Sequence, residues 1–230
     1  MNIMTSETTE NMETTSLRTQ SDVKTKISKK VYIKVKRVID VILASIALIL
    51  LSPLFAIIAI AIKIDSKGPV FFAHKRIGKN GKIIKLYKFR SMVINAEELI
   101  KSFTPEQMRE YKENYKLTND PRITKVGKFL RKTSLDELPQ LINIINGDLS
   151  IIGPRPVVAD ELEKYGTNKD KFLSVTPGLT GYWAANGRSN TTYEQRMEME
   201  LYYIDNLSLK MDIKVFFKTI LSVVKKEGAM

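Results

Sequence analysis

The chain has 230 residues, with 37 Lys and Arg against 25 Asp and Glu, one His and no Cys. This length permits one compact domain with appendages or at most two small domains, and the lack of Cys excludes disulfides and thiolate zinc sites. A Ser-His-Asp triad or a histidine metal site would have to be built around His74 alone, and 43% apolar residues exclude a wholly disordered chain. The formal charge of +12 raises nucleic acid as a partner, so the position of this charge matters.

The N-terminal part divides into a polar tail, a basic flank and an apolar segment. Residues 1–23 are rich in Thr, Ser and Glu, which predicts a disordered tail. Residues 24–37 carry seven basic groups and no acidic one, and residues 63–90 carry nine basic groups against one acidic group. Between these flanks, residues 41–62 contain no charge. The positive charge therefore borders one apolar segment.

The apolar segment is long enough to cross a membrane, but it contains a helix breaker. As a straight helix it would reach about 33 Å, against a hydrocarbon core of roughly 30 Å. Pro53, after Ser52, removes one amide donor and crowds the carbonyl of Ile49, so the helix must bend or break. Because both basic flanks favour the cytoplasmic side, we predict a re-entrant helix-break-helix within residues 24–65. A kinked single span is the alternative, and a cleaved signal peptide is disfavoured.

Residues 66–230 are expected to form a mainly helical α+β domain with a small β-hairpin. Apolar and β-favouring residues at 70–72 and 82–89 flank Asn80-Gly81, which is typical of a hairpin turn. A polar helix is expected to begin at Thr104, which has a first-turn proline and a Gln three residues later, and to continue to about Lys116.

Two further helices are expected near the C-terminus. A similar cap, from Thr191 to Glu194, opens the first. The second begins near Ser208 and gathers its apolar residues on one stripe, namely Ile213, Phe216, Phe217, Ile220, Leu221 and Val224. This stripe either packs into the core or lies in the membrane interface.

The densest set of chemical groups lies in residues 131–140, which include Asp136 and Glu137. One interpretation is a capping box from Ser134 to Glu137 that only starts a helix. That register puts Pro139 where an amide must enter the helical ladder, so we expect a start one or two residues later, with Asp136 at or beside the cap. A carboxylate there is held ionised by the helix dipole, and it is either a magnesium ligand or a nucleophile that forms an acyl phosphate.

Two later loops contain arginine. Arg155 stands between Pro154 and Pro156, where a rigid guanidinium suits either a bidentate phosphate contact or a structural ion pair. Residues 176–181 and 186–188, which end at Arg188, form glycine-rich loops that allow close approach to a charged ligand.

These motifs, in this order, resemble the bacterial sugar transferases known as monotopic phosphoglycosyl transferases, which begin polyprenol-linked glycan assembly. The resemblance covers about residues 36–224. It rests on Lys36-Arg37, Ser52-Pro53, residues 68–72, residues 88–92, Asp136-Glu137, residues 153–156, residues 177–181, residues 186–188, residues 203–206 and Asp212. It implies a monotopic enzyme with an interfacial catalytic domain on the cytoplasmic face of the bacterial inner membrane.

The resemblance also implies a two-step reaction and its residues. Asp136 attacks the sugar-proximal phosphate of a UDP-sugar, releases UMP and holds the phosphosugar as an acyl phosphate, which polyprenol (undecaprenyl) phosphate then takes. Glu137 binds Mg²⁺ together with Asp136 or accepts a proton, and both roles stay open. The implied substrate-binding residues are Lys88, Arg90, Arg131, Arg155, Arg188 and Asp212. Lys36 and Arg37 would meet the headgroups of inner-leaflet lipids.

Some expectations stay open at this level. His74 and Ala184 stand where family members usually carry Gln, which leaves the identity of the sugar undetermined. The main alternative is a membrane-anchored binding protein in which Asp136-Glu137 only starts a helix. Nucleic acid is not expected as a partner, because the basic groups border the apolar segment and no basic-helix or zinc module accompanies them. The chain is expected to be a minimal catalytic form, and a homodimer is compatible with the sequence but not required by it.

Overall fold

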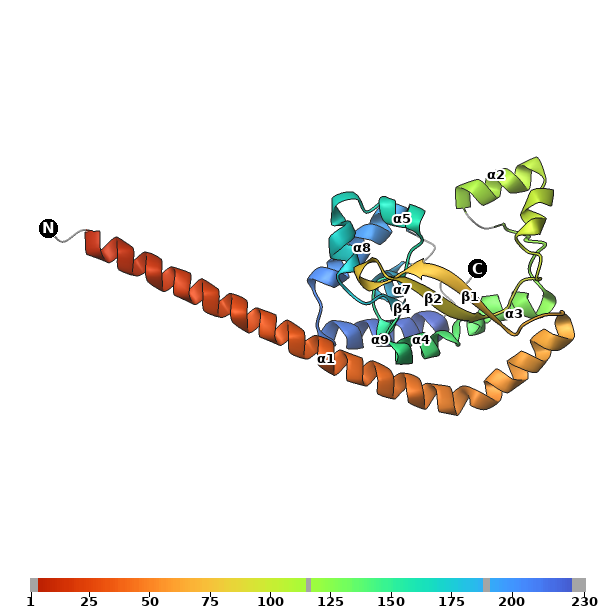
Figure 1. Cartoon of the computed structure of the whole chain (residues 1–230), viewed down its shortest axis with the longest axis horizontal. Coiled ribbons are helices and arrows are strands. Elements are labelled where there is room, and N and C mark those ends of the chain that lie inside the picture. The colour runs from red at the N-terminus through yellow and green to blue at the C-terminus, as the bar shows by residue number, and fades with distance from the viewer. Residues whose placement is uncertain (1–3, 115–116, 188–190, 225–230) are drawn as a thin grey trace.

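The computed structural model describes residues 4–114, 117–187 and 191–224, with the backbone alone for residues 4–28, 112–114 and 223–224. A long N-terminal helix runs along one side of a mixed domain that contains short helices and two small sheets (Figure 1). The predicted α+β class, mainly helical with a small β-hairpin, is confirmed.

The first helix, α1, extends from Met4 to Asp65 and continues through Pro53. Figure 1 shows a bend in the C-terminal part of α1, so the predicted bend is present. The predicted break into two helices is not present, because the helix is continuous. The hydroxyl of Ser52 donates to the carbonyl of Ile49 at 2.8 Å. This carbonyl is the one that loses its amide partner to the proline, so the serine supplies a substitute and the helix continues.

α1 also includes residues 4–23, for which the sequence predicts a disordered tail. Extension of an existing helix needs no new nucleus, so the helix formed by the apolar segment propagates into the polar residues before it. The division of the chain at residues 23 and 65 stays a prediction.

Much of the apolar surface of α1 is uncovered. The stretch Lys29–Asp65 is long and apolar enough to cross a membrane, and only 11% of its most apolar window is buried. Ile49 and Leu50 are 71% and 73% exposed, whereas Ala44 and Ile62 are buried against the domain. One face of the helix thus attaches to the domain, and the opposite face is apolar and uncovered.

Strands β1 (Phe71–Ile77) and β2 (Ile83–Phe89) form the predicted antiparallel hairpin. Asn80 and Gly81 both adopt positive φ values, 55° and 77°, in the turn Lys79–Gly81. An Asn-Gly pair tolerates this conformation, which explains why this dipeptide marks the hairpin. A second sheet pairs the short strands β3 (Ser150–Ile152) and β4 (Gly178–Thr180) in parallel.

Short helices make up most of the remaining domain. They are α2 (Pro105–Asn114), α3 (Lys125–Thr133), α4 (Gln140–Asn146), α5 (Ala159–Glu163), α6 (Lys169–Leu173), α7 (Tyr182–Asn186), α8 (Tyr193–Asp205) and α9 (Leu209–Val224), with 3₁₀ turns at Glu98–Ser102, Leu135–Glu137 and Gly166–Asn168. The predicted cap at Thr104 is confirmed, since it exchanges hydrogen bonds with Gln107. The predicted end at Lys116 lies outside the described residues. The cap of α8 is Thr192 with Gln195, one residue later than predicted.

Three apolar clusters hold these elements together. One gathers α8, α9 and the loops beside them around Tyr203 and Val215. The second joins α1, β2 and α4, and the third joins α1, β2 and α3 through residues such as Phe89. Because α1 and β2 take part in two clusters, the hairpin is fixed against the long helix and against both helices that border Asp136.

The apolar stripe of α9 faces away from the core. Its five members with described side chains are 38% to 60% exposed, namely Ile213, Phe216, Phe217, Ile220 and Leu221. Asp212 and Val215, on the opposite side of α9, are buried instead. The alternative in which this stripe packs into the core is therefore wrong for these five residues, and the interfacial alternative stays a prediction. The side chain of Val224 lies outside the described residues.

Candidate active site

Asp136 lies in a 3₁₀ turn, Leu135–Glu137, between α3 and α4. Ser134 ends α3 in the left-handed conformation, with φ of 57°, and makes no side-chain cap, so the capping-box interpretation is wrong. α4 begins only at Gln140, after Pro139, which is later than predicted. The proline has no amide to donate, so the residues before it use i to i+3 bonds, such as that from Leu138 to Leu135 at 3.3 Å.

The environment of Asp136 differs from the one expected at a helix cap. The residue is only 8% exposed, and burial raises the pKa of its carboxyl, with the neighbouring Glu137 acting in the same direction. The charges of Lys88 and Arg131 oppose this shift and lower the pKa. The expectation that a helix dipole keeps the carboxylate ionised is therefore wrong, because the pKa is raised overall and Lys88 and Arg131 reduce this shift without reversing it.

Lys88 reaches the carboxylate pair from strand β2. Its Nζ donates to Oε1 of Glu137 at 2.6 Å. The strand is held in place by Asn143 of α4, which is fully buried. Asn143 Oδ1 accepts the amide of Tyr87 at 2.9 Å, and its Nδ2 donates to the carbonyl of Lys85 at 2.7 Å. The sequence analysis missed Asn143, although an amide flanked by Ile142 and Ile144 in an otherwise apolar stretch is a usable signal.

Two other predicted arginines occupy different positions. Arg131, in the last turn of α3, donates from Nε to the hydroxyl of Ser91 at 2.9 Å and lies near Asp136. Arg90 is only 6% exposed and donates to the carbonyls of Ser66 and Lys67, just after the end of α1. The structure thus brings Arg131 to the site and gives Arg90 a structural position instead, because the chain leaving α1 needs a donor for its free carbonyls.

Arg155 lies on the turn that follows β3. Its own side chain is exposed. Burial and then the charge of Arg155 lower the pKa of Arg76, and burial together with cations that include Lys88 and Arg155 lowers the pKa of His74. Arg76, Lys88 and Arg155 thus form one positively charged region around His74, and Lys88 also acts on Asp136. Arg188 lies outside the described residues.

A partly buried ion-pair group lies next to this region. Glu161 accepts from Arg76 Nη1 at 3.2 Å and from Arg196 Nη1 at 3.1 Å. The guanidinium of Arg196 also lies over the rings of Trp183 and Tyr193, at 4.8 and 5.2 Å. The sequence analysis did not identify this group, because its members come from three separate elements.

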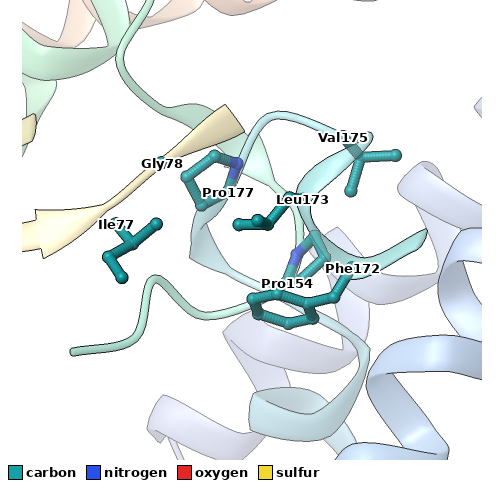
Figure 2. Close-up of a pocket in the computed structure, with 7 residues that line it drawn as sticks. All are labelled: Ile77, Gly78, Pro154, Phe172, Leu173, Val175 and Pro177. Carbon is teal, nitrogen blue, oxygen red and sulfur yellow. The ribbon is translucent and has the colours of Figure 1, made fainter. Parts of the chain in front are cut away.

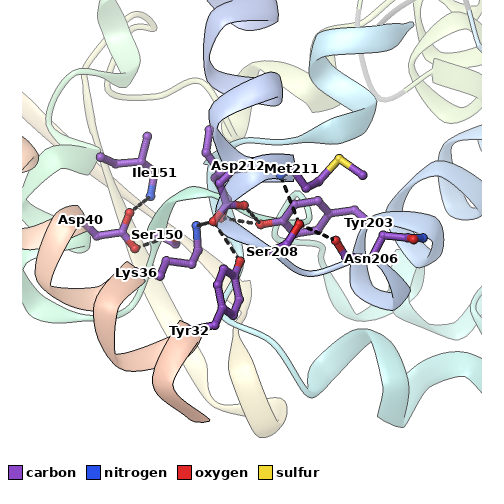
Figure 3. Close-up of polar contacts among 11 residues, drawn as sticks. Tyr32, Lys36, Asp40, Ser150, Ile151, Tyr203, Asn206, Ser208, Met211 and Asp212 are labelled. Carbon is purple, nitrogen blue, oxygen red and sulfur yellow. Dashed lines mark hydrogen bonds and ion pairs between the residues drawn. The ribbon is translucent and has the colours of Figure 1, made fainter. Parts of the chain in front are cut away.

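Lys36 and Asp212 form an ion pair with each other (Figure 3). Lys36 Nζ contacts Asp212 Oδ2 at 2.9 Å, and the hydroxyls of Tyr32 and Tyr203 donate to the same carboxylate at 2.8 and 2.6 Å. Arg37 donates to the carbonyls of two residues near the end of α4. These contacts attach α1 to the domain, so the headgroup and substrate roles of the three residues stay predictions.

A second contact in Figure 3 completes this attachment. The carboxylate of Asp40 accepts from the hydroxyl of Ser150 at 2.7 Å and from the amide of Ile151 at 3.1 Å. Asp40 is only 4% exposed. The long helix is therefore joined to β3 and α9 by polar contacts as well as by apolar packing.

A hollow beside the Arg155 turn is apolar (Figure 2). It is lined by Ile77, Gly78, Pro154, Phe172, Leu173, Val175 and Pro177. None of these residues carries a charge, so this hollow has no group for phosphate chemistry.

The pair Asp136 and Glu137 provides the oxygen ligands that suit Mg²⁺. Within the described ranges, no group of three or more His, Cys, Asp or Glu residues is arranged to hold a metal by itself. Mg²⁺ is commonly bound by one or two carboxylates together with substrate phosphates, so this pair fits a metal that arrives with a phosphorylated ligand.

Comparison with known proteins gives a consistent picture. The family model described as bacterial sugar transferase matches residues 31–226. The chain is 46% identical over 197 residues to the exopolysaccharide production protein ExoY of Rhizobium meliloti, which covers 84% of this chain and 87% of that protein. It is 44% identical to the undecaprenyl-phosphate galactose phosphotransferase of Salmonella typhimurium, over 84% of this chain and 41% of that protein.

A third relative is the UDP-glucose:undecaprenyl-phosphate glucose-1-phosphate transferase of Escherichia coli, 41% identical over 80% of this chain and 39% of that protein. The chain thus spans less than half the length of several curated relatives that it matches. Because the family model covers most of the chain and includes the buried carboxylate, its cations and the long apolar helix, this protein belongs to the bacterial sugar transferase family.

Proposed function

We propose that this protein transfers a sugar 1-phosphate from a UDP-sugar to undecaprenyl phosphate, with release of UMP, as the first membrane step in the biosynthesis of a polysaccharide or glycoconjugate. The observation that carries this proposal is the carboxylate of Asp136, buried in a tight turn and flanked by the charges of Lys88 and Arg131. The names of the relatives support the donor and acceptor classes.

The reaction proceeds in two displacements at one phosphorus atom. A carboxylate oxygen of Asp136 attacks the sugar-proximal phosphorus, the bond to the bridging oxygen breaks, and UMP leaves with that oxygen. A phosphate oxygen of undecaprenyl phosphate then attacks the same phosphorus and releases the carboxylate of Asp136. Lys88 and Arg131 balance the charge of the transferred phosphoryl group in both steps.

Asp136 and Glu137 would hold Mg²⁺ together with the diphosphate of the donor. When bound, the metal offsets negative charge on the phosphates. Glu137 contacts Lys88 at 2.6 Å, so its carboxylate is already oriented within the charged region. The proton-accepting role of Glu137 is the alternative for the second displacement.

The membrane arrangement follows from the exposed apolar surfaces. The open face of α1 and the exposed stripe of α9 both require an apolar environment, and both flanks of the apolar segment are basic. We propose that α1 enters and leaves the inner leaflet on the cytoplasmic side, bent at Pro53. The site then lies at the level of the lipid phosphate, where cytosolic UDP-sugars reach it.

The test is UMP release by the purified protein with Mg²⁺, undecaprenyl phosphate and a panel of UDP-sugars. Asp136→Asn should lower the rate by roughly 10⁴-fold or more, because the nucleophile is lost. Asp170→Asn, an exposed position on α6, is the matched control and should not change the rate. Equal release by wild type and Asp136→Asn would refute the mechanism and leave a lipid-binding role for the carboxylate pair.

A further inference from the structure

A buried carboxylate accepts a hydrogen bond from the backbone of the turn that carries Arg155. Glu200, on α8, is only 1% exposed, and its Oε1 accepts the backbone amide of Arg155 at 3.0 Å. Pro154 and Pro156 have no amide hydrogen. The N–H of Arg155 is therefore the one amide donor of residues 154–156, and Glu200 binds it.

The backbone on either side of this amide is fixed by close packing. Gly153 donates to the carbonyl of Thr180 at 2.9 Å, and Gly178 donates to the carbonyl of Pro154 at 2.8 Å. A Cβ atom at Gly178 or Gly181 would collide with the backbone of Gly153, so the two loops touch without intervening side chains. The turn is thus anchored at Gly153 and Pro154, and Glu200 supplies the next anchor along the chain.

Arg155 lies near the charged residues of β1. The residue is exposed, and its charge lies close enough to His74 and Arg76 to act on both. His74 and Arg76 lie on one face of β1 opposite Leu86 and Ile84 of β2, and Lys88 of β2 lies opposite Phe72. The direction of the Arg155 side chain therefore depends on a backbone that Glu200 holds.

Burial of the Glu200 carboxylate lowers the stability of the fold, so a contribution to stability does not explain why a carboxylate occupies this position. Within the described residues, Oε2 of Glu200 has no hydrogen-bond partner, and neither do Nε and Nη2 of Arg196 or the hydroxyl of Tyr165. Burial raises the pKa of Glu200 to about 7, although the Arg155 amide and the charge of Arg196 oppose the shift. A buried carboxylate with a free oxygen is costly, and an apolar side chain at this position would avoid that cost.

We propose that Glu200 is a positioning residue for donor binding: by accepting the Arg155 amide, it directs the Arg155 guanidinium toward the phosphates of the UDP-sugar. The inference rests on the proposed function, because it assigns the donor phosphates as the ligand of Arg155. Glu200 itself touches no substrate and acts through the turn.

Steady-state kinetics of Glu200→Met, Arg155→Met and the double variant test the proposal. Glu200→Met should raise the KM for the UDP-sugar about 10-fold, with a smaller change in kcat, and it should add less than twofold in the Arg155→Met background. Glu200→Gln keeps an oxygen that accepts the amide and should recover most of the loss. Independent, multiplying effects of the two single variants would overturn the proposal, as would a loss in kcat alone.

Hydrogen exchange at the Arg155 amide provides a second measurement that needs no turnover. Glu200→Met should make this amide exchange faster, whereas the amides of Gly153 and Gly178 should keep their protection. Unchanged exchange at Arg155 would overturn the role of Glu200, whereas no UMP release by wild type would instead count against the proposed function. If Glu200→Met does not fold, Glu200→Gln remains decisive, because a folded Gln variant with a KM as high as that of Arg155→Met contradicts the proposal.

Discussion

Asn143 fixes the backbone of β2 next to Lys88 through two side-chain hydrogen bonds. Truncation of its side chain should lower the free energy of unfolding by an amount that these two bonds allow us to estimate. Asn143→Ala leaves two backbone groups without their side-chain partners, the amide of Tyr87 and the carbonyl of Lys85. Both contacts are only partly buried, so we assign about 1–2 kcal/mol to each and a total loss of about 2–4 kcal/mol. For a domain of this size, this corresponds to a fall in Tm of roughly 5–15 °C.

The substitution should also lower the catalytic rate, because β2 positions Lys88 next to Asp136 and Glu137. We expect slower UMP release by Asn143→Ala at temperatures where the variant remains folded. Thermal unfolding in detergent gives the stability, and Asn146→Ala is the matched control, because it removes an exposed side chain of the same type from the same helix. Equal Tm values for the two variants would refute the reasoning, because the two hydrogen bonds would then contribute nothing.

Three further predictions follow from the charges and surfaces. Burial raises the folded-state pKa of Asp136 above the unfolded value of about 3.9. The folded protein therefore loses stability as pH rises through the folded pKa, so Asp136→Asn should raise Tm at neutral pH, and this gain should vanish as pH falls toward 4. Asp170→Asn, an exposed change, should show no such pattern. Lys88→Met removes the charge that most strongly lowers the pKa of Asp136. The acidic limb of the pH profile of kcat/KM should therefore move to higher pH. A limb at the same pH in both proteins would contradict the role of Lys88. Phe217→Glu, on the exposed stripe of α9, should weaken flotation with anionic vesicles more than Tyr202→Glu on α8, and equal flotation would count against an interfacial α9.

Several features of this protein follow from local sequence alone. The uncharged run at residues 41–62 needs an apolar environment in any fold, and Pro53 bends its helix because the ring removes one hydrogen bond. Asn80-Gly81 adopts positive φ values that few other residue pairs tolerate, so the hairpin is set by its turn. Asp136 and Glu137 are recognisable as a carboxylate pair from their neighbours in the chain.

The surroundings of these features were decided by tertiary packing. Lys36 and Asp212 lie 176 residues apart, and only the fold brings them to 2.9 Å, so local sequence could not predict their ion pair. The ionisation of Asp136 likewise depends on burial and on cations from β2 and α3 rather than on a helix cap.

For the apolar stripe of α9 and the carboxylate of Glu200, too, the sequence identifies the residues and tertiary packing decides their surroundings. Periodicity identifies the stripe, but it does not say whether another element covers it, and the structure leaves it exposed. Glu200 looks like any charged residue on a helix until the turn of Arg155 packs onto it. Local pattern determines which groups a segment presents, whereas distance, burial and partner depend on contacts between segments far apart in the chain, and those contacts set both the pKa values and the geometry of the site.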